Sequence, residues 1–379
     1  MPIHGHCDPA FAAVRTAFET NFTEFGDLGA SFCLIQDGEV RVDLWGGYLD
    51  EEQTQSWDED TIVNVWSTTK TMTALSALLL ADQGELDFDA PVCRYWPEFA
   101  ANGKKDIRVR HLMSHTAGLS GLDQPTVPED LYDSEKMTTL LAAQAPWWEP
   151  GTASGYHGIT QGYLIGEVIR RITGQSLGTF FRTELAEPLG ADFHIGLAPE
   201  HDSRVGLLVP PPGSAPAAQV SPDSIAGRTF RSPFAPAQYS QTVEWRRAEI
   251  PAAGGTGNAR SVARVQSLLA CGGEVFGRRL MSEAGCLRAL EEQTNGTDLV
   301  LGVPLRHGLG YGLGNAARPM PFPNMCYWGG WGGSTVLVDF DNRIALSYVM
   351  NRMGDGVMGD PRGEALTRAA YEAIVSQTL

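Results

Sequence analysis

The sequence predicts an α/β fold in which both ends of the chain build one lobe and a mainly helical domain is inserted between them. Strand-like segments lie near the N-terminus and again around residue 340. Between about residues 85 and 200, apolar residues recur instead at helical spacing. We therefore expect an α/β domain over 1–75 and 255–379, and a mainly helical domain over 76–254.

The N-terminal segment is expected to open as a helix followed by two strands. Asp8 and Pro9 are typical of a helix start, and the apolar residues that follow recur at helical spacing. The segments 31–36 and 39–45 are apolar or alternating, and they flank Asp37-Gly38. Because Asp-Gly favours the tight turns of β-hairpins, we expect these two segments to pair.

The remaining elements follow in order along the chain. A helix should begin at residue 67 and end near Gly84, and another should follow the segment that starts at 250. The proline-rich stretch over 202–250 predicts a long irregular segment, either a pocket wall or lid, or a disordered linker. Two strands should meet at Asp341-Asn342, and a C-terminal helix should begin after Asp360-Pro361.

Composition narrows the class of function. The formal net charge is −17, which argues against a nucleic-acid partner because phosphate binding needs a basic surface. No stretch approaches the roughly 20 continuous apolar residues of a membrane span, and the N-terminus lacks the pattern of a secretory signal. The six cysteines show no CxxC spacing. We therefore expect a cytoplasmic protein with reduced thiols and neither metal nor cofactor.

The pentapeptide GQSLG at 174–178 has the G-x-S-x-G spacing of a nucleophile elbow. An elbow needs a strand immediately before the serine, whereas the preceding apolar residues recur at helical spacing. Gly174 is expected to end that helix, and Ser176 to cap the next one. The pattern therefore does not predict a catalytic role for Ser176.

A second candidate nucleophile lies in the stretch STTK, where Ser67 and Lys70 have S-x-x-K spacing. On a helix, a separation of three residues places both side chains on one face. A serine hydroxyl is a weak nucleophile, and a lysine whose pKa is lowered by burial can serve as its base. The alternative is an ordinary helix cap beside a surface lysine.

Four other stretches occur in a set order around STTK. They read VRHLMSHTAGL at 109–119, WEPGTASGYHG at 148–158, IPAAGGTG at 250–257 and YWGGWGGS at 327–334. With STTK they resemble the serine β-lactamase-related superfamily, in the branch of class C β-lactamases, D,D-peptidases and family VIII carboxylesterases. His111 and His115 share the spacing of a zinc pair, but HLMSH lacks the glutamate of HExxH, so no metal is expected.

The resemblance implies a β-lactamase-like fold, with an antiparallel sheet flanked by helices and the site next to an inserted helical domain. Ser67 then matches the nucleophile, and Lys70 and Tyr156 match the base and proton-shuttle pair. Tyr156 would act as a base only if a cation such as Lys70 stabilised its phenolate. The backbone amides of Ser67 and Trp331 would form the oxyanion hole.

Two departures from the family pattern bear on the substrate. The second motif reads Y-H-G at 156–158 and lacks the family asparagine, and the third reads W-G-G at 328–330 in place of K-T-G. Without the lysine, no cation is expected to bind a substrate carboxylate. We therefore predict a carboxylesterase acting on a small neutral ester, with substrate contacts from Trp328, Gly329, Gly330 and His157. A β-lactamase, a D-amino-acid peptidase or amidase, and a catalytically silent relative are the alternatives.

Overall fold

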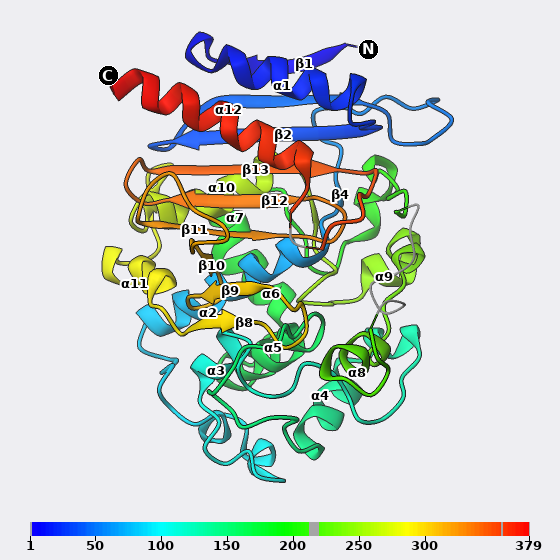
Figure 1. Cartoon of the computed structure of the whole chain (residues 1–379), viewed down its shortest axis with the longest axis vertical. Helices are drawn as coiled ribbons and strands as arrows, with labels where there is room; N and C mark the ends of the chain where they lie inside the picture. The colour runs from blue at the N-terminus through cyan, green and yellow to red at the C-terminus, as the bar shows by residue number, and fades with distance from the viewer. Residues whose placement is uncertain (1, 212–219, 358, 379) are drawn as a thin grey trace.

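The computed structural model describes residues 2–211, 220–357 and 359–378, and within them the fold is built on a nine-stranded antiparallel sheet (Figure 1). The strand order is β1-β3-β2-β13-β12-β11-β10-β9-β8. The two halves of the chain meet where β2 pairs with β13, with Phe32 opposite Tyr348. The strands are β1 (Ile3–Cys7), β2 (Gly29–Gln36), β3 (Glu39–Gly47), β8 (Thr294–Thr297), β9 (Pro304–His307), β10 (Gly312–Leu313), β11 (Met325–Gly329), β12 (Thr335–Asp339) and β13 (Ile344–Met350). The sheet is thus assembled from both termini, as predicted.

The chain opens with a strand rather than with the expected helix. β1 is an edge strand that pairs antiparallel with β3. Its sequence, IHGHC, is mostly polar and is partly or fully exposed, so it lacks the apolar alternation by which a half-buried strand is recognised. The helix α1 (Ala12–Thr23) follows a short 3-10 turn, and the Asp8 side chain caps that turn as predicted by accepting from Ala10 N–H.

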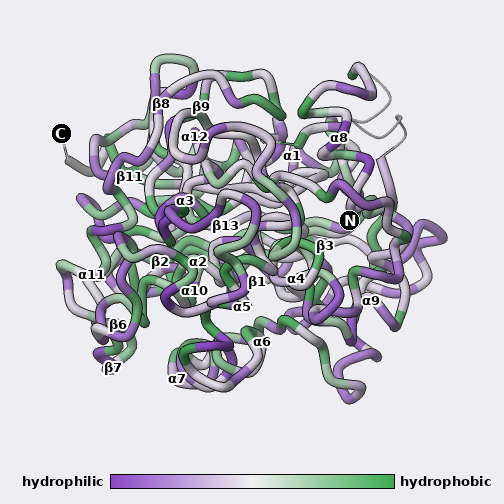
Figure 2. Tube along the Cα trace, turned by 90° about the horizontal axis from the view of Figure 1, so that it is seen from below, coloured by the Kyte–Doolittle hydropathy of each residue, from purple (hydrophilic) through white to green (hydrophobic). Residues whose placement is uncertain are grey.

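Helices cover both faces of the sheet. The helix α10 (Ala259–Ala270) packs on β2, β12 and β13, while α12 (Pro361–Thr378) packs against α1 and β13 and crosses in front of the sheet in Figure 1. The helix α2 (Thr69–Asp82) lies in the interior with α10 (Figure 2), and its residues from Thr69 to Leu80 are all buried. A helix with this burial has neighbours on every side, which explains why even its polar residues are shielded from water.

The middle of the chain supplies the remaining helices. These are α3 (Val109–Met113), α4 (Ser134–Ala143), α5 (Thr160–Thr173), α6 (Leu177–Phe181), α7 (Glu187–Leu189), α8 (Ile225–Arg231), α9 (Val243–Arg247) and α11 (Glu283–Leu287). Two small ladders pair β4 (Val63–Asn64) with β5 (Thr256–Gly257) and β6 (Glu274–Val275) with β7 (Arg278–Arg279). The boundaries of the two predicted domains stay a prediction. Within the proline-rich segment, residues 212–219 lie outside the described residues.

No helix in the described ranges has both the length and the apolar character that a membrane crossing requires.

Candidate active site

Ser67 lies where β4 leads into α2, in a 3-10 turn over Trp66–Thr68. The residue before it, Trp66, has a φ of 46°, a left-handed conformation that is costly for a bulky side chain. The Trp66 N–H donates to Asn64 Oδ1 at 3.3 Å, and its ring lies 5.0 Å from the Trp331 ring and 5.2 Å from the Trp245 ring. These contacts stabilise the strained turn and present Ser67 at the start of α2.

The structure brings Ser67, Lys70 and Tyr156 together. Lys70 Nζ lies 2.9 Å from Ser67 Oγ, because the two side chains are one helical turn apart on the same face. The Tyr156 hydroxyl lies 2.6 Å from the same oxygen and comes from the loop before α5. All three residues are buried.

Lys70 is shielded from water, and this loss of hydration disfavours its charged form. Its Nζ contacts the carbonyl oxygens of Gly158 at 2.6 Å and Ala252 at 3.0 Å, and no carboxylate in the described residues forms an ion pair with it. Burial therefore lowers the pKa of Lys70 well below 10.5. A neutral amine can donate its two N–H groups to these carbonyls and direct its lone pair at the hydroxyl of Ser67.

Tyr156 is not set up to ionise. Burial, together with the nearby Asp298, raises the pKa of its hydroxyl above 10, although the hydrogen bond to Ser67 opposes this shift. Lys70 Nζ lies 5.0 Å from the centre of the Tyr156 ring. The condition under which Tyr156 would act as a base, a phenolate stabilised by the charge of Lys70, is therefore disfavoured, because burial shifts the pKa of each group toward its neutral form.

The end of β11 approaches the backbone of Ser67. A Cβ atom on Gly330 would lie 2.2 Å from Val65 O and 3.2 Å from Ser67 N, so only glycine fits there. Within the described chain, neither the amide of Ser67 nor that of Trp331, the residue after Gly330, donates a hydrogen bond. Two residues that line the cavity beside the nucleophile, Ser67 and Trp331, therefore have backbone N–H groups without an acceptor in the described part of the chain.

A cavity of about 110 Å³ opens beside Ser67. Its lining is mostly apolar, and none of the described residues that form it carries a charged side chain. One wall comes from the segment 229–235, so the described part of the proline-rich stretch does line the pocket, as the sequence suggested. Phe230 and Phe234 in this wall were not predicted, because an irregular segment has no periodicity that marks its inward side chains. The other lining aromatic rings are those of Trp66, Tyr156 and Trp331.

None of the four predicted substrate contacts is among the residues that line this cavity. Trp328 is 1% exposed, and its ring stacks on His115 with centroids 5.5 Å apart, behind Tyr156. Gly329 is buried in β11. His157 is fully buried, and its Nε2 accepts from Leu119 N–H at 3.0 Å while Nδ1 bonds to the Gly155 carbonyl.

Burial lowers the pKa of His157 to about 4, so this ring is neutral and both of its nitrogens already have partners. These bonds hold the ring within the loop, and the substrate contact of His157 stays a prediction. The Trp328 ring lies 6.0 Å from the Tyr156 ring and does not line the cavity, whereas Gly330 lies against the backbone of Ser67.

Ser176 behaves as a helix cap. Its Oγ accepts from Thr179 N–H at the start of α6 and donates to Glu249 Oε1 at 2.6 Å. Gly174 ends α5 with a φ of 72°. GQSLG therefore joins two helices, as predicted, and no lysine or histidine contacts the Ser176 hydroxyl in the described structure. The described residues also contain no group of three or more side chains suited to hold a metal.

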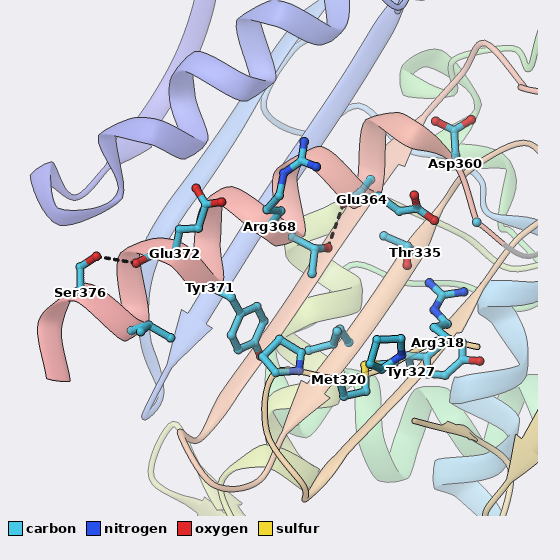
Figure 3. Close-up of a pocket in the computed structure, with 17 residues that line it drawn as sticks. Arg318, Met320, Tyr327, Thr335, Asp360, Glu364, Arg368, Tyr371, Glu372 and Ser376 are labelled. Atoms are coloured by element: carbon cyan, nitrogen blue, oxygen red, sulfur yellow. Dashed lines mark hydrogen bonds between the residues drawn. The ribbon is translucent and has the colours of Figure 1, made fainter. Parts of the chain in front are cut away.

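A larger cavity of about 660 Å³ lies on the other face of β11 and β12, next to α12 (Figure 3). Tyr327 lines it, whereas the next residue, Trp328, points toward Tyr156. Because side chains alternate along a strand, the two cavities are separated by the sheet. The larger cavity contains none of the predicted site residues.

The chain is similar to known proteins over most of its length. The family model described as Beta-lactamase matches residues 18–370. The chain is 37% identical over 369 residues to the esterase/beta-lactamase LipL of Mycobacterium tuberculosis, a match that covers 93% of this chain and 83% of the relative. A solved family VIII carboxylesterase is similar with a TM-score of 0.93 and 41% identity, over 98% of this chain and 100% of the other. A penicillin-binding protein homologue from Caulobacter crescentus matches equally well in structure, at 39% identity with the same coverage and TM-score.

Proposed function

Because this chain belongs to the beta-lactamase family and is a hydrolase similar to family VIII carboxylesterases, we propose that it cleaves small neutral carboxylic esters with Ser67 as nucleophile. The observation that carries this proposal is the contact of one serine oxygen with both a buried lysine and a buried tyrosine. Lys70 Nζ lies 2.9 Å and the Tyr156 hydroxyl 2.6 Å from Ser67 Oγ.

The acylation step uses the neutral form of Lys70. Ser67 Oγ attacks the ester carbonyl carbon while its proton passes to the lone pair of Lys70 Nζ. The Tyr156 hydroxyl donates to Ser67 Oγ in the resting site, which fixes the direction in which the serine proton points. The amides of Ser67 and Trp331 then donate to the negative oxygen that forms on the substrate.

The remaining steps release the alcohol and the acid. The bond to the leaving alkoxide breaks as that alkoxide takes up the proton held by Lys70, and the Tyr156 hydroxyl is the neighbouring group that can relay it. Water then attacks the acyl-enzyme, giving its proton to the same base, and the carboxylic acid leaves Ser67. Each proton taken from a nucleophile is thus returned to a leaving group.

The lining of the cavity favours an ester over a β-lactam. A β-lactam and a peptide C-terminus carry a carboxylate, and the lining of the cavity beside Ser67 contains no cationic side chain among the residues that the structure describes. A charge-assisted contact of that kind contributes about 1.5–3 kcal/mol. Its loss would weaken binding of a carboxylate-bearing substrate by one to two orders of magnitude. β-Lactamase activity stays the second candidate, since the LipL relative is named an esterase/beta-lactamase.

The test combines a panel of p-nitrophenyl esters with a chromogenic cephalosporin, using Ser67→Ala and Ser176→Ala as matched serine variants. We expect ester turnover to disappear in Ser67→Ala and to persist in Ser176→Ala, and cephalosporin turnover to be slow or absent. A fluorophosphonate followed by peptide mass spectrometry should label Ser67. Loss of turnover only in Ser176→Ala would refute the assignment, and fast cephalosporin cleavage without ester cleavage would establish the second candidate instead.

A further inference from the structure

The turn that contains the Trp331 amide is stabilised by hydrogen bonds of its own backbone. Trp331 is followed by Gly332 with a φ of 92° and Gly333 with a φ of 127°, conformations that favour glycine. The Gly332 N–H donates to Gly356 O at 3.0 Å, and the Gly332 carbonyl accepts from Gly354 N–H at 2.8 Å. A side chain from the start of α12 also donates a hydrogen bond to this turn.

That side chain is Arg362, whose Nη2 donates to Gly332 O at 3.0 Å. Its other four N–H groups donate to Asp360 Oδ1 and Oδ2, to Asp27 Oδ1 and to Arg352 O, at distances of 2.7 to 2.9 Å. A guanidinium has five donors in a rigid plane, so every donor of Arg362 is used and its orientation is fixed.

The network around Arg362 is buried and tightly packed. The exposed fractions of the side chains are 5% for Arg362, 0% for Asp27 and 6% for Asp360, which lies at the N-terminal end of α12 (Figure 3). A Cβ on Gly333 would lie 3.0 Å from Asp360 and 3.1 Å from Arg362 Nη2. The ion network therefore lies directly against the turn. The backbone of the turn has no room to shift toward α12.

We propose that Arg362 is a positioning residue for the reaction: by holding Gly332 O it fixes the adjoining Trp331 amide where the oxyanion forms. This inference rests on the proposed function, since it takes Trp331 as an oxyanion donor. Arg362 does not line the cavity beside Ser67 and acts only through the backbone of the turn. A small displacement of one donor weakens binding of the transition state more than binding of the neutral ester.

The test compares two conservative variants at opposite ends of the network. Arg362→Lys keeps the positive charge but reduces the number of N–H donors from five to three. The hydrogen bond to Gly332 O is therefore weakened. Tyr348→Phe removes the hydroxyl that donates to both oxygens of Asp27 at 2.7 Å, away from the turn. We expect kcat for p-nitrophenyl acetate to fall about tenfold or more in Arg362→Lys with KM nearly unchanged. Tyr348→Phe should lower Tm without lowering kcat of the folded enzyme.

A milder variant covers the case in which Arg362→Lys does not fold. Asp360→Asn keeps the shape of the side chain and loosens one of the two carboxylates that orient Arg362, so kcat should fall less than in Arg362→Lys but more than in Tyr348→Phe. Equal kcat in all folded variants would overturn the positioning role, and so would kcat losses that merely follow the fraction unfolded. Fluorophosphonate labelling of the wild type separates the two proposals, because absence of label at Ser67 would overturn the proposed function itself.

Discussion

Replacing Lys70 by methionine removes the proposed base while nearly preserving the volume of the side chain. In the structure, Lys70 is the only amine in contact with Ser67 Oγ among the described residues, at 2.9 Å. Methionine cannot accept the serine proton, so the hydroxyl has to attack without a base. We expect kcat/KM for p-nitrophenyl acetate to fall sharply in Lys70→Met.

The magnitude follows from what one general base contributes. Such a group typically accelerates a reaction about 10²–10⁴-fold. Each tenfold change corresponds to about 1.36 kcal/mol of activation free energy, so the loss in Lys70→Met should be about 3–5 kcal/mol. Because burial lowers the pKa of Lys70, the wild type should show kcat/KM that rises with pH through this lowered pKa and then stays level. This rising limb should be missing from Lys70→Met.

Lys104 provides a matched control. It is also a buried lysine whose Nζ donates to backbone carbonyls, those of Ala101 at 2.7 Å and of Gln144, and burial lowers its pKa to about 8. Lys104→Met removes the same chemical groups but does not involve Ser67. The assay is the pH profile of kcat/KM for both variants, with Tm measured alongside. If Lys70→Met stays within tenfold of Lys104→Met at pH 8, or if it keeps the rising limb, the base assignment is wrong.

Three further changes test other parts of the site. Tyr156→Phe keeps the ring but removes the hydroxyl 2.6 Å from Ser67 Oγ, so kcat should fall by about 10² or more, and a near-normal burst of p-nitrophenol would contradict the relay. Ser176→Ala removes a helix cap and a partner of Glu249, which should lower the free energy of unfolding in urea by about 1 kcal/mol and leave kcat unchanged; a lost kcat would restore GQSLG as the elbow. Trp328→Lys would bury an unpaired amine behind Tyr156 rather than place a cation in the cavity. It should cost about 3–5 kcal/mol of stability without any gain in cephalosporin turnover, and such a gain would refute the placement of Trp328.

The elements of the fold that carried local signals were predicted. Asp37-Gly38 does lie between β2 and β3, Asp341-Asn342 lies between β12 and β13, and α12 begins at Pro361. β1 was missed because it is stabilised by pairing with β3, more than thirty residues away, rather than by a pattern within its own sequence. Pairing of that kind leaves no periodic trace in a short polar strand.

In the candidate site, too, the contacts that follow from local sequence were predicted from spacing, and those set by distant residues were not. The contact between Ser67 and Lys70 follows from their spacing on one helix, and Tyr156 was found only through a motif, since 89 residues separate it from Ser67. The surroundings of Trp328 and His157 depend on which side of a strand or loop meets the cavity, and that is set by tertiary packing. Spacing on one helix therefore predicted the contact between Ser67 and Lys70, the resemblance predicted that Tyr156 lies beside them, and neither predicted the packing around them.

Lys70 also makes folding release a proton. In an unfolded chain this amine has its ordinary pKa of 10.5 and is charged at neutral pH, whereas its burial in the folded chain removes hydration and shifts the pKa toward the neutral form. The unfolded state then binds more protons, so this residue makes stability increase with pH, by up to about 1.4 kcal/mol per unit, between its lowered native pKa and 10.5. As the pH falls through this range, the native state loses stability while its Lys70 stays neutral. Lys70 becomes protonated in the native state only below its lowered pKa. Keeping this lysine uncharged therefore lowers the free energy of unfolding.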